Sequence, residues 1–367
     1  MDLPAPHRKK QTLAQFALPN DALAYAILIL DFALYFGCVV FSILVEHLAL
    51  KLLFASLAGF FIAQLFVIAH DAAHTSYVSS RRANGIIARL TFMPTLHNYT
   101  IWQFVHNRLH HAFPNVKNYN SWSPMSYEEY QRLPKWRQLL EHVYRSPLGY
   151  GPYYLIERWF KDKLLPRKHT PSKYHAGGWR DFWLNLLFAA CLLSGIVALA
   201  MYTGQSPVTA ILISAVIPFL VWNYAMGLTT YQQHTHPTLK WYPNLVEGRA
   251  SVKSYSEVTI YMQYPKWYLY LTHNCYAHPA HHINARIPLY RLQQAQQEYM
   301  QLCPEKTHHV VAFSMKEFLQ TQRTCKLYDY TRQQWLDFSG QPTTPALASE
   351  TSPADSAASL LVKKRAI

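Results

Sequence analysis

The sequence predicts an all-α integral membrane protein in which four transmembrane helices form two hairpins beneath a cytosolic helical cap. Half of the 367 residues are apolar, and only 15% are charged, against roughly 25% in an ordinary soluble protein. The charges are clustered, with long uncharged runs between them. This composition excludes a disordered chain and argues against an ordinary soluble enzyme.

Four apolar runs reach the roughly 20 residues that a helix needs to cross a bilayer. They cover residues 22–45, 48–69, 182–202 and 208–228. The last two runs contain no charged residue, whereas the first contains Asp31 and the second contains Lys51. Only a few residues separate the runs within each pair, so each pair is predicted to form a hairpin.

The basic residues predict the orientation, because cytoplasmic loops near span ends carry an excess of Lys and Arg. Residues 70–180 contain 16 basic and 6 acidic side chains, whereas the connection 203–207 contains none. With an even number of spans, both termini and the central loop are expected on the cytosolic side.

Composition also divides the chain into segments. Residues 1–21 are predicted to be a cytosolic N-terminal segment and 22–292 a membrane catalytic domain. Residues 293–338 are predicted to be a cytosolic helical segment, and 339–367, rich in Ser, Pro, Thr and Ala, a disordered tail. Five cysteines without a CxxC pair suggest neither a disulfide framework nor a thiolate zinc site.

Histidine is the residue type that indicates chemistry. Eight of the 19 histidines fall in three groups: HDAAH at 70–74, HNRLHH at 106–111 and HPAHH at 278–282. In a helix, residues spaced as His70 and His74, or as His106 and His110, share one face. Pro279 suits the first position of a helix, so a helix is expected to begin there with His278 as its cap.

Three such groups on the predicted cytosolic side indicate metal binding. Neutral imidazole is a common ligand of Zn, Cu, Fe and Ni. Eight imidazoles exceed what one ion can coordinate, so the sequence predicts two metal ions.

Together with QQHTHP at 232–237 and RIPLYRL at 286–292, the three histidine groups resemble the membrane fatty-acid desaturases over roughly residues 65–292. The resemblance implies two iron ions on an all-histidine site, with O2 as co-substrate, that remove two hydrogens from a fatty acyl chain. It also implies a further ligand near the end of the fourth span, for which His234 is the best match and His236 the rival. The implied metal ligands are His70, His74, His106, His110, His111, His234, His278, His281 and His282.

The chain departs from the family pattern at two places. Many plant-type members have Cys-Gly where this chain has Ala72-Ala73, and a β-branched residue where it has Pro279. Neither change removes a ligand, but both weaken any transfer of regiospecificity.

A second set of residues is expected to orient the ligands: Asp71, Asn107, Gln233, His236, His273 and Asn274. Asp71, beside two ligands, is suited to accept the second imidazole N–H, and its alternative role is that of a helix-cap residue. The histidines at 97, 142, 169, 175, 308 and 309 are expected to be solvated or interfacial.

The reaction type has alternatives. Methylene C–H bonds have no acidic proton, so an oxidant made from O2 must cleave them. A hydroxylase, ketolase, acetylenase or fatty-acid decarboxylase would share that oxidant and differ in later steps. A histidine-rich metal transporter would need ionisable residues along a path through the spans, which the last two runs lack. Nucleic-acid binding is not expected, because membrane orientation and attraction to anionic headgroups explain the net charge of +14.

The expected partners follow from the resemblance. The acyl substrate could be carried as a lipid, a CoA ester, a carrier-protein ester or a free acid, held in a narrow apolar tunnel. The sequence has no His-Pro-Gly-Gly haem signature, so a separate donor such as ferredoxin, or cytochrome b5 with its reductase, is expected. An acidic ferredoxin could dock on the basic cytosolic face.

Overall fold

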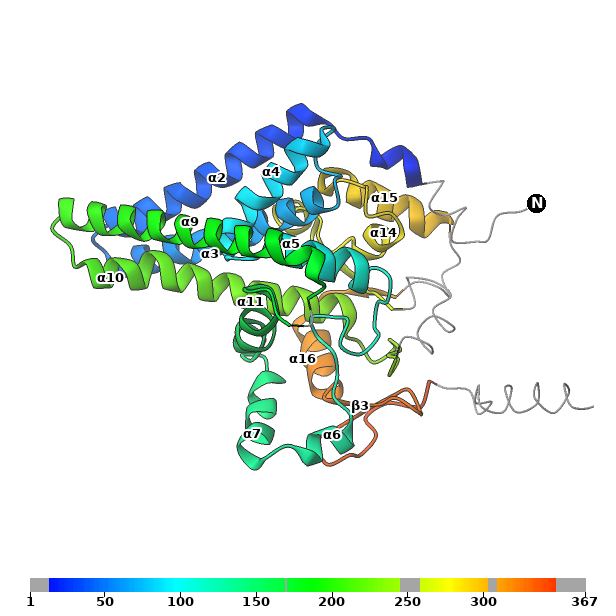
Figure 1. Cartoon of the computed structure of the whole chain (residues 1–367). Helices are drawn as coiled ribbons and strands as arrows, with labels where there is room; N and C mark the ends of the chain where they lie inside the picture. Colours follow the sequence, from blue (N-terminus) through cyan, green and yellow to red (C-terminus); the bar gives the residue numbers. More distant parts are fainter. Residues whose placement is uncertain (1–12, 169, 245–257, 303–308, 348–367) are drawn as a thin grey trace, which may run out of the picture.

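Long helices dominate the protein, whose computed structural model describes residues 13–168, 170–244, 258–302 and 309–347. In Figure 1, α2 (Asp21–Leu44), α3 (Leu48–Ala73) and α9 (His175–Tyr202) lie alongside one long helix in which α10 (Pro207–Ile211) continues into α11 (Ile217–His234). Helices α14 (His278–Ile283) and α15 (Leu289–Leu302) lie near one end of these long helices. A separate lobe beneath the long helices contains α6 (Tyr127–Arg132), α7 (Lys135–Tyr144), α16 (Met315–Thr324) and strand β3 (Leu327–Asp329). The predicted predominance of helix is confirmed.

The first pair of long helices comprises α2 (Asp21–Leu44) and α3 (Leu48–Ala73). The Asn20 side chain accepts a hydrogen bond from Leu23 N at 3.1 Å, which satisfies an otherwise unpaired amide at the start of α2. Only three residues separate the two helices, and they pack against each other. Helix α3 continues past the predicted apolar run and carries the first histidine group at its end.

The second pair comprises α9 (His175–Tyr202) and a helix built from three pieces. These are α10 (Pro207–Ile211), the π-helix η6 (Leu212–Val216) and α11 (Ile217–His234). The wide turn ends two residues before Pro218, whose ring cannot supply an amide for a regular helical bond. Helix α11 extends six residues beyond the predicted run, up to His234.

Among the described residues, four helical stretches are long and apolar enough to cross a membrane. They are Asp21–Leu44, Leu48–Ala73, Ser172–Tyr202 and Pro207–His234. Each contains most or all of one predicted run, so run length and hydropathy located them correctly.

Shorter helices fill the connection between the two pairs. They are α4 (Arg81–Phe92), η2 (Met93–Thr95), α5 (Tyr99–Phe104), η3 (Val105–His110), α6 (Tyr127–Arg132), α7 (Lys135–Tyr144), α8 (Tyr150–Tyr153), η4 (Tyr154–Lys163) and η5 (Ser172–Tyr174). A 3-10 helix, η1 (Leu13–Ala17), precedes α2. The turns η3 and η4 are π-helices.

The region after α11 contains helices α13 (Lys266–Leu271), α14 (His278–Ile283), α15 (Leu289–Leu302) and α16 (Met315–Thr324). It also contains a parallel pair of strands, β1 (Tyr261–Gln263) and β2 (Val310–Ala312), and an antiparallel pair, β3 (Leu327–Asp329) and β4 (Gln334–Leu336). The all-α prediction is therefore wrong in detail. These strands are three residues long and rich in aromatic or β-branched side chains, which favour extended backbone but are too few to indicate a strand by periodicity.

The region after α15 contains strands as well as helix. Residues 293–338, expected to be helical, include three of these strands. Residues 339–347 pack on β4, where Thr343 N donates to Trp335 O at 2.9 Å. The rest of the predicted tail, 348–367, and most of the N-terminal segment, 1–12, lie outside the described residues.

Candidate metal centre

The structure gathers the nine predicted histidines into two adjacent groups. Within each group, the potential ligand nitrogens all lie within 4.8 Å of one another. We call His70, His74, His106, His111 and His281 group one, and His110, His234, His278 and His282 group two. The groups are in contact, since the rings of His111 and His282 stack with centroids 4.6 Å apart.

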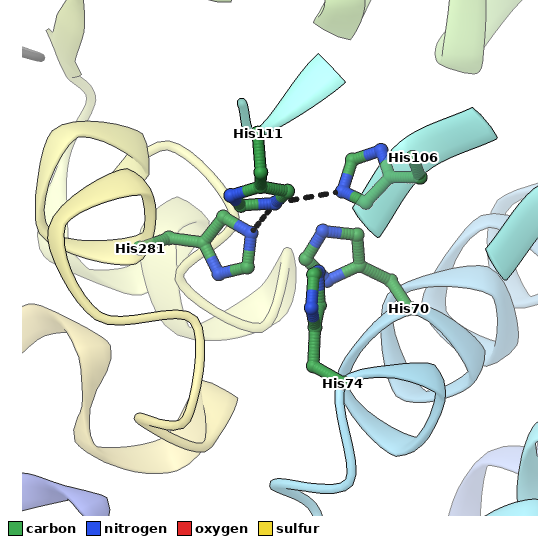
Figure 2. A group of neighbouring side chains, drawn as sticks. All are labelled: His70, His74, His106, His111 and His281. Atoms are coloured by element: carbon green, nitrogen blue, oxygen red, sulfur yellow. Dashed lines mark hydrogen bonds between the residues drawn. The ribbon is translucent and has the colours of Figure 1, made fainter. Parts of the chain in front are cut away.

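Group one draws on three segments far apart in the sequence. His70 and His74 come from successive turns of α3, as predicted, and their ring centroids lie 4.9 Å apart. Figure 2 shows these rings facing His106 and His111, with His281 approaching from the opposite side. The Nε2 atom of His111 lies 3.1 Å from that of His106 and 3.0 Å from that of His281.

The second histidine motif differs from the prediction. An α-helical spacing would have paired His106 with His110. Residues 105–110 instead form the π-helix η3, in which His111 N donates to His106 O, five residues back, at 3.0 Å. This wider turn pairs His106 with His111 in group one and directs His110 into group two.

Group two is built around α14 and the end of α11. The Nε2 atom of His278 lies 2.9 Å from that of His234 and 2.9 Å from that of His282. Helix α14 begins at His278, one residue earlier than predicted, with Ala277 as its cap. His278 and His282 are one turn apart and share group two, whereas the intervening His281 faces group one.

Burial keeps these imidazoles in the neutral form that binds metals. Burial is the largest cause that lowers the pKa of His74, His106, His278 and His281 well below the ordinary value, and neighbouring imidazoles lower it further. Because protonation of one ring would place a positive charge in a buried site beside other imidazoles, the rings stay neutral. Each neutral ring keeps a nitrogen lone pair that can bind a metal cation.

Asp71 orients group one. Its Oδ1 lies 3.1 Å from His70 Nδ1, and its Oδ2 accepts a hydrogen bond from Leu289 N. Asp71 is buried within α3, while the C-cap of that helix is His74. The carboxylate thus contacts the His70 ring and ties α3 to the start of α15, whereas the cap position that was its alternative is occupied by His74.

Three other predicted orienting residues bond to backbone near the site. Asn107 Nδ2 donates to Ala73 O at 3.0 Å. Gln233 Nε2 donates to Cys275 O at 2.9 Å, and Asn274 Nδ2 donates to Leu289 O at 3.0 Å. These bonds connect segments that carry the grouped histidines.

The two remaining histidines of that set lie elsewhere. His273 Nε2 is 2.6 Å from Asp31 Oδ2 of α2. His236 belongs to neither group: its Nδ1 is 2.8 Å from Thr238 Oγ1 and its Nε2 is 3.2 Å from Glu317 Oε1. Of the two rivals for the last ligand position, the structure brings only His234 into a group.

Two residues that the motif spacing did not indicate also contact the groups. The Oδ1 atom of Asn115 lies 3.1 Å from His234 Nδ1, and the Trp102 ring stacks on His106 with centroids 4.2 Å apart. His97, expected to be solvated or interfacial, is buried with Nε2 3.0 Å from Tyr154 Oη. Burial lowers the pKa of His97 to about 3. Asn115 and Trp102 each lie four residues from the histidine motif at 106–111 in the sequence, and this closeness was the available sign that they contact the site.

A cavity of about 160 Å³ opens beside the two groups. His70, His106 and His281 of group one line it, as do His110, His234 and His278 of group two. Its other walls are mainly apolar and come from α3 and α11, for example Val67 and Met226. The site can therefore hold metal ions in two histidine groups beside an apolar molecule bound in the cavity.

Comparisons with known proteins agree with this geometry. The chain is 28% identical over 242 residues to a chloroplastic omega-6 fatty acid desaturase of Glycine max, covering 65% of this chain and 53% of that protein. It thus spans about half the length of that plant relative. It is 27% identical over 361 residues to a fatty acid desaturase of Bacillus subtilis, covering 95% of this chain and 96% of that protein.

A third relative is the sn-1 acyl-lipid omega-3 desaturase (ferredoxin) of a Nostoc species, 28% identical over 249 residues and covering 66% of each chain. The family model described as fatty acid desaturase matches residues 46–314, nearly three quarters of this chain, and includes all nine grouped histidines. The chain therefore belongs to the fatty acid desaturase family.

Proposed function

We propose that the protein is an O2-dependent di-iron oxidoreductase of the membrane that introduces a double bond into a fatty acyl chain. The observation that carries this proposal is the pair of adjacent all-histidine groups along one apolar cavity. Family membership supports the reaction class, and the relatives named above are all desaturases.

The residues present fit metal ions. The nitrogen His74 Nε2, in group one, is buried without a hydrogen-bond partner among the described residues. Buried polar atoms of this kind are rare unless a ligand completes them. Group one would hold one iron and group two the other, and the bound irons would supply the activated oxygen that removes hydrogen from carbon.

The chain's own residues would position the substrate. Apolar walls of α3 and α11 exclude water and hold an acyl chain beside the histidines. Asp71 and Trp102 hold the rings of His70 and His106 in place. In the overall reaction, two hydrogens from adjacent carbons, two further electrons and two protons reduce O2 to two waters.

The proposal includes a membrane orientation and an electron donor. The four long helices would cross the bilayer as two hairpins, with both termini and the histidine groups on the cytosolic side. The excess of basic over acidic residues between positions 70 and 180 supports this orientation. A separate ferredoxin is the proposed donor, since the Nostoc relative is named for it.

Product analysis tests the proposed reaction. The full chain would be expressed in a bacterium without polyunsaturated fatty acids, and its transmethylated lipids would be separated by gas chromatography and mass spectrometry. We expect a new ester that has lost two hydrogens. The His281→Ala variant should abolish this product, whereas the matched control His142→Ala, whose ring stacks on Phe338, should retain it.

Other outcomes would overturn the proposal. A product that has gained one oxygen would indicate a hydroxylase, and a product shortened by one carbon would indicate a decarboxylase. Purified protein should hold two tightly bound irons per chain, whereas exchangeable ions without a lipid product would indicate a transporter.

A further inference from the structure

One stretch of the cavity wall is cationic. The π-helix η4 contributes Arg158 and Lys163, and the loop that follows the second histidine motif contributes Ser121. The remaining walls include apolar side chains such as Phe66 and Leu292. The cavity is therefore amphipathic, lined by two cations and by a larger set of apolar side chains, which we call the apolar arm.

Lys163 is a buried cation that forms no ion pair with any described residue. Its side chain is only 4% exposed. Within the part of the chain that the structure describes, no hydrogen bond or ion pair engages its ammonium. The nearby carboxylate of Asp162 bonds Arg158 instead, with 3.1 Å between Oδ2 and Nη1. Burial and the adjacent Arg158 lower the pKa of Lys163 to about 7.

This arrangement leaves the Lys163 ammonium without a paired carboxylate among the described residues. Two cations share one carboxylate, and an ion removed from water is costly unless an opposite charge compensates it. An anion in the cavity would supply the missing charge and accept hydrogen bonds from the ammonium, which are stronger than bonds between neutral groups.

We propose that Lys163, with Arg158, forms a subsite for an anionic oxygen group at the polar end of the acyl substrate, while the apolar arm holds its chain. The proposal rests on the proposed function in one respect, that an acyl chain enters this cavity. The anionic group could be the carboxylate of a free fatty acid or the phosphodiester of a phospholipid.

Fluorescence quenching can measure binding without turnover, because Trp102 and Trp222 both line the cavity. The probes would be 9,10-dibromostearate and its uncharged methyl ester, added to the full chain in neutral detergent. A second arm would compare phosphatidylglycerol with diacylglycerol, both carrying brominated chains. We expect the wild type to bind the anionic member of at least one pair about tenfold more tightly, and the responding arm identifies the source.

Variants then assign the preference to Lys163. Lys163→Met and Lys163→Gln should bring the affinities for the two members within about twofold, and Lys163→Arg should retain the preference. The matched control is Lys161→Met on the same π-helix, since Lys161 is 53% exposed and pairs with Glu157. Thermal unfolding of each variant would verify folding, and removal of an uncompensated buried charge should not lower stability.

The proposal is overturned if the wild type shows no preference in either arm, or binds none of the four probes. It is equally overturned if folded Lys163→Met and Lys163→Gln keep the preference. These results are separable from the proposed function: a double bond formed without any anion preference would refute the subsite alone. An anion preference without a double bond would refute the reaction alone.

Discussion

Two residues apart in the sequence, His234 and His236 have different surroundings. His234 ends α11, with Nε2 facing His278 and Nδ1 held by Asn115. His236 lies beyond the helix and bonds Thr238 and Glu317. It also precedes Pro237, and a residue before proline is disfavoured in helical geometry. Only His234 directs a ring nitrogen at other imidazoles.

Substitution of these two histidines should therefore affect metal content differently. We expect His234→Ala to lose bound iron, because group two would retain only three of its four imidazoles. His236→Ala should keep the wild-type content and serves as the matched control. Iron per chain can be measured by mass spectrometry of acid-digested purified protein. Metal loss confined to His236→Ala would show that the other ring is the ligand.

Acid should destabilise the metal-free protein. The folded state holds His106, His278 and His281 neutral, with pKa values well below 6.5. Below pH 6.5 the unfolded chain binds more protons than the folded chain, so the free energy of unfolding falls as the pH decreases. Each such group contributes at most about 1.4 kcal/mol per pH unit.

Thermal unfolding of chelator-treated protein in detergent between pH 7.5 and 5 would measure this effect. His106→Gln removes one such group, so its unfolding temperature should depend less on pH than that of the wild type. An unfolding temperature that stayed constant across this range would contradict the assignment of neutral, buried rings.

At the scale of the elements, the site depends on the close approach of α3 and α11, which carry His70, His74 and His234. Gly59 allows it. A Cβ at this position would lie 2.6 Å from both Pro218 O and Val221 Cβ. Side chains in a packed interior cannot yield by that much without a shift of one helix.

Gly59→Ala should therefore destabilise the protein by about 1–3 kcal/mol, the usual cost of overpacking. It should also reduce bound iron by separating the histidines of α3 from His234. Gly37→Ala on α2 is the matched control, because a Cβ there would meet no atom within 4 Å. The test measures the unfolding temperature and the iron content of Gly59→Ala and of Gly37→Ala. Equal behaviour of the two variants would indicate that the helices are not held at this distance.

The elements differ in how far the sequence could predict them. The four long helices follow from run length and hydropathy, which are local properties. The pairing of His70 with His74 follows from regular helical spacing. The pairing of His106 with His111 does not, because a π-turn has no local signature in these residues. Asn115 and Lys163 meet the site only through tertiary packing, which residue spacing does not encode.

The proposed orientation places the cytosolic cap and the far end of the long helices on opposite sides of the bilayer. Leu148, between α7 and α8, is 80% exposed, and Tyr202, at the end of α9, is 89% exposed. The first position belongs to the proposed cytosolic cap. The second lies at the far end of the long helices.

Cysteine labelling tests this assignment. In a chain with its native cysteines replaced by serine, Leu148→Cys should react with an impermeant maleimide only from the cytosolic side, and Tyr202→Cys only from the opposite side. A chain that retains only Cys191, which is exposed on α9, should stay unreactive in membranes, because lipid would cover it. Reaction of both introduced cysteines from one side would refute the orientation.

Two peptide bonds link histidine group one directly to histidine group two. His110 and His111 are consecutive yet belong to different groups, and so are His281 and His282. An ion that immobilises one group therefore lowers the entropic cost of ordering the other, and filling should be cooperative. Native mass spectrometry during iron titration should find chains with none or two ions and few with one. The placement of consecutive histidines in different groups would then keep the number of chains with a single bound ion low.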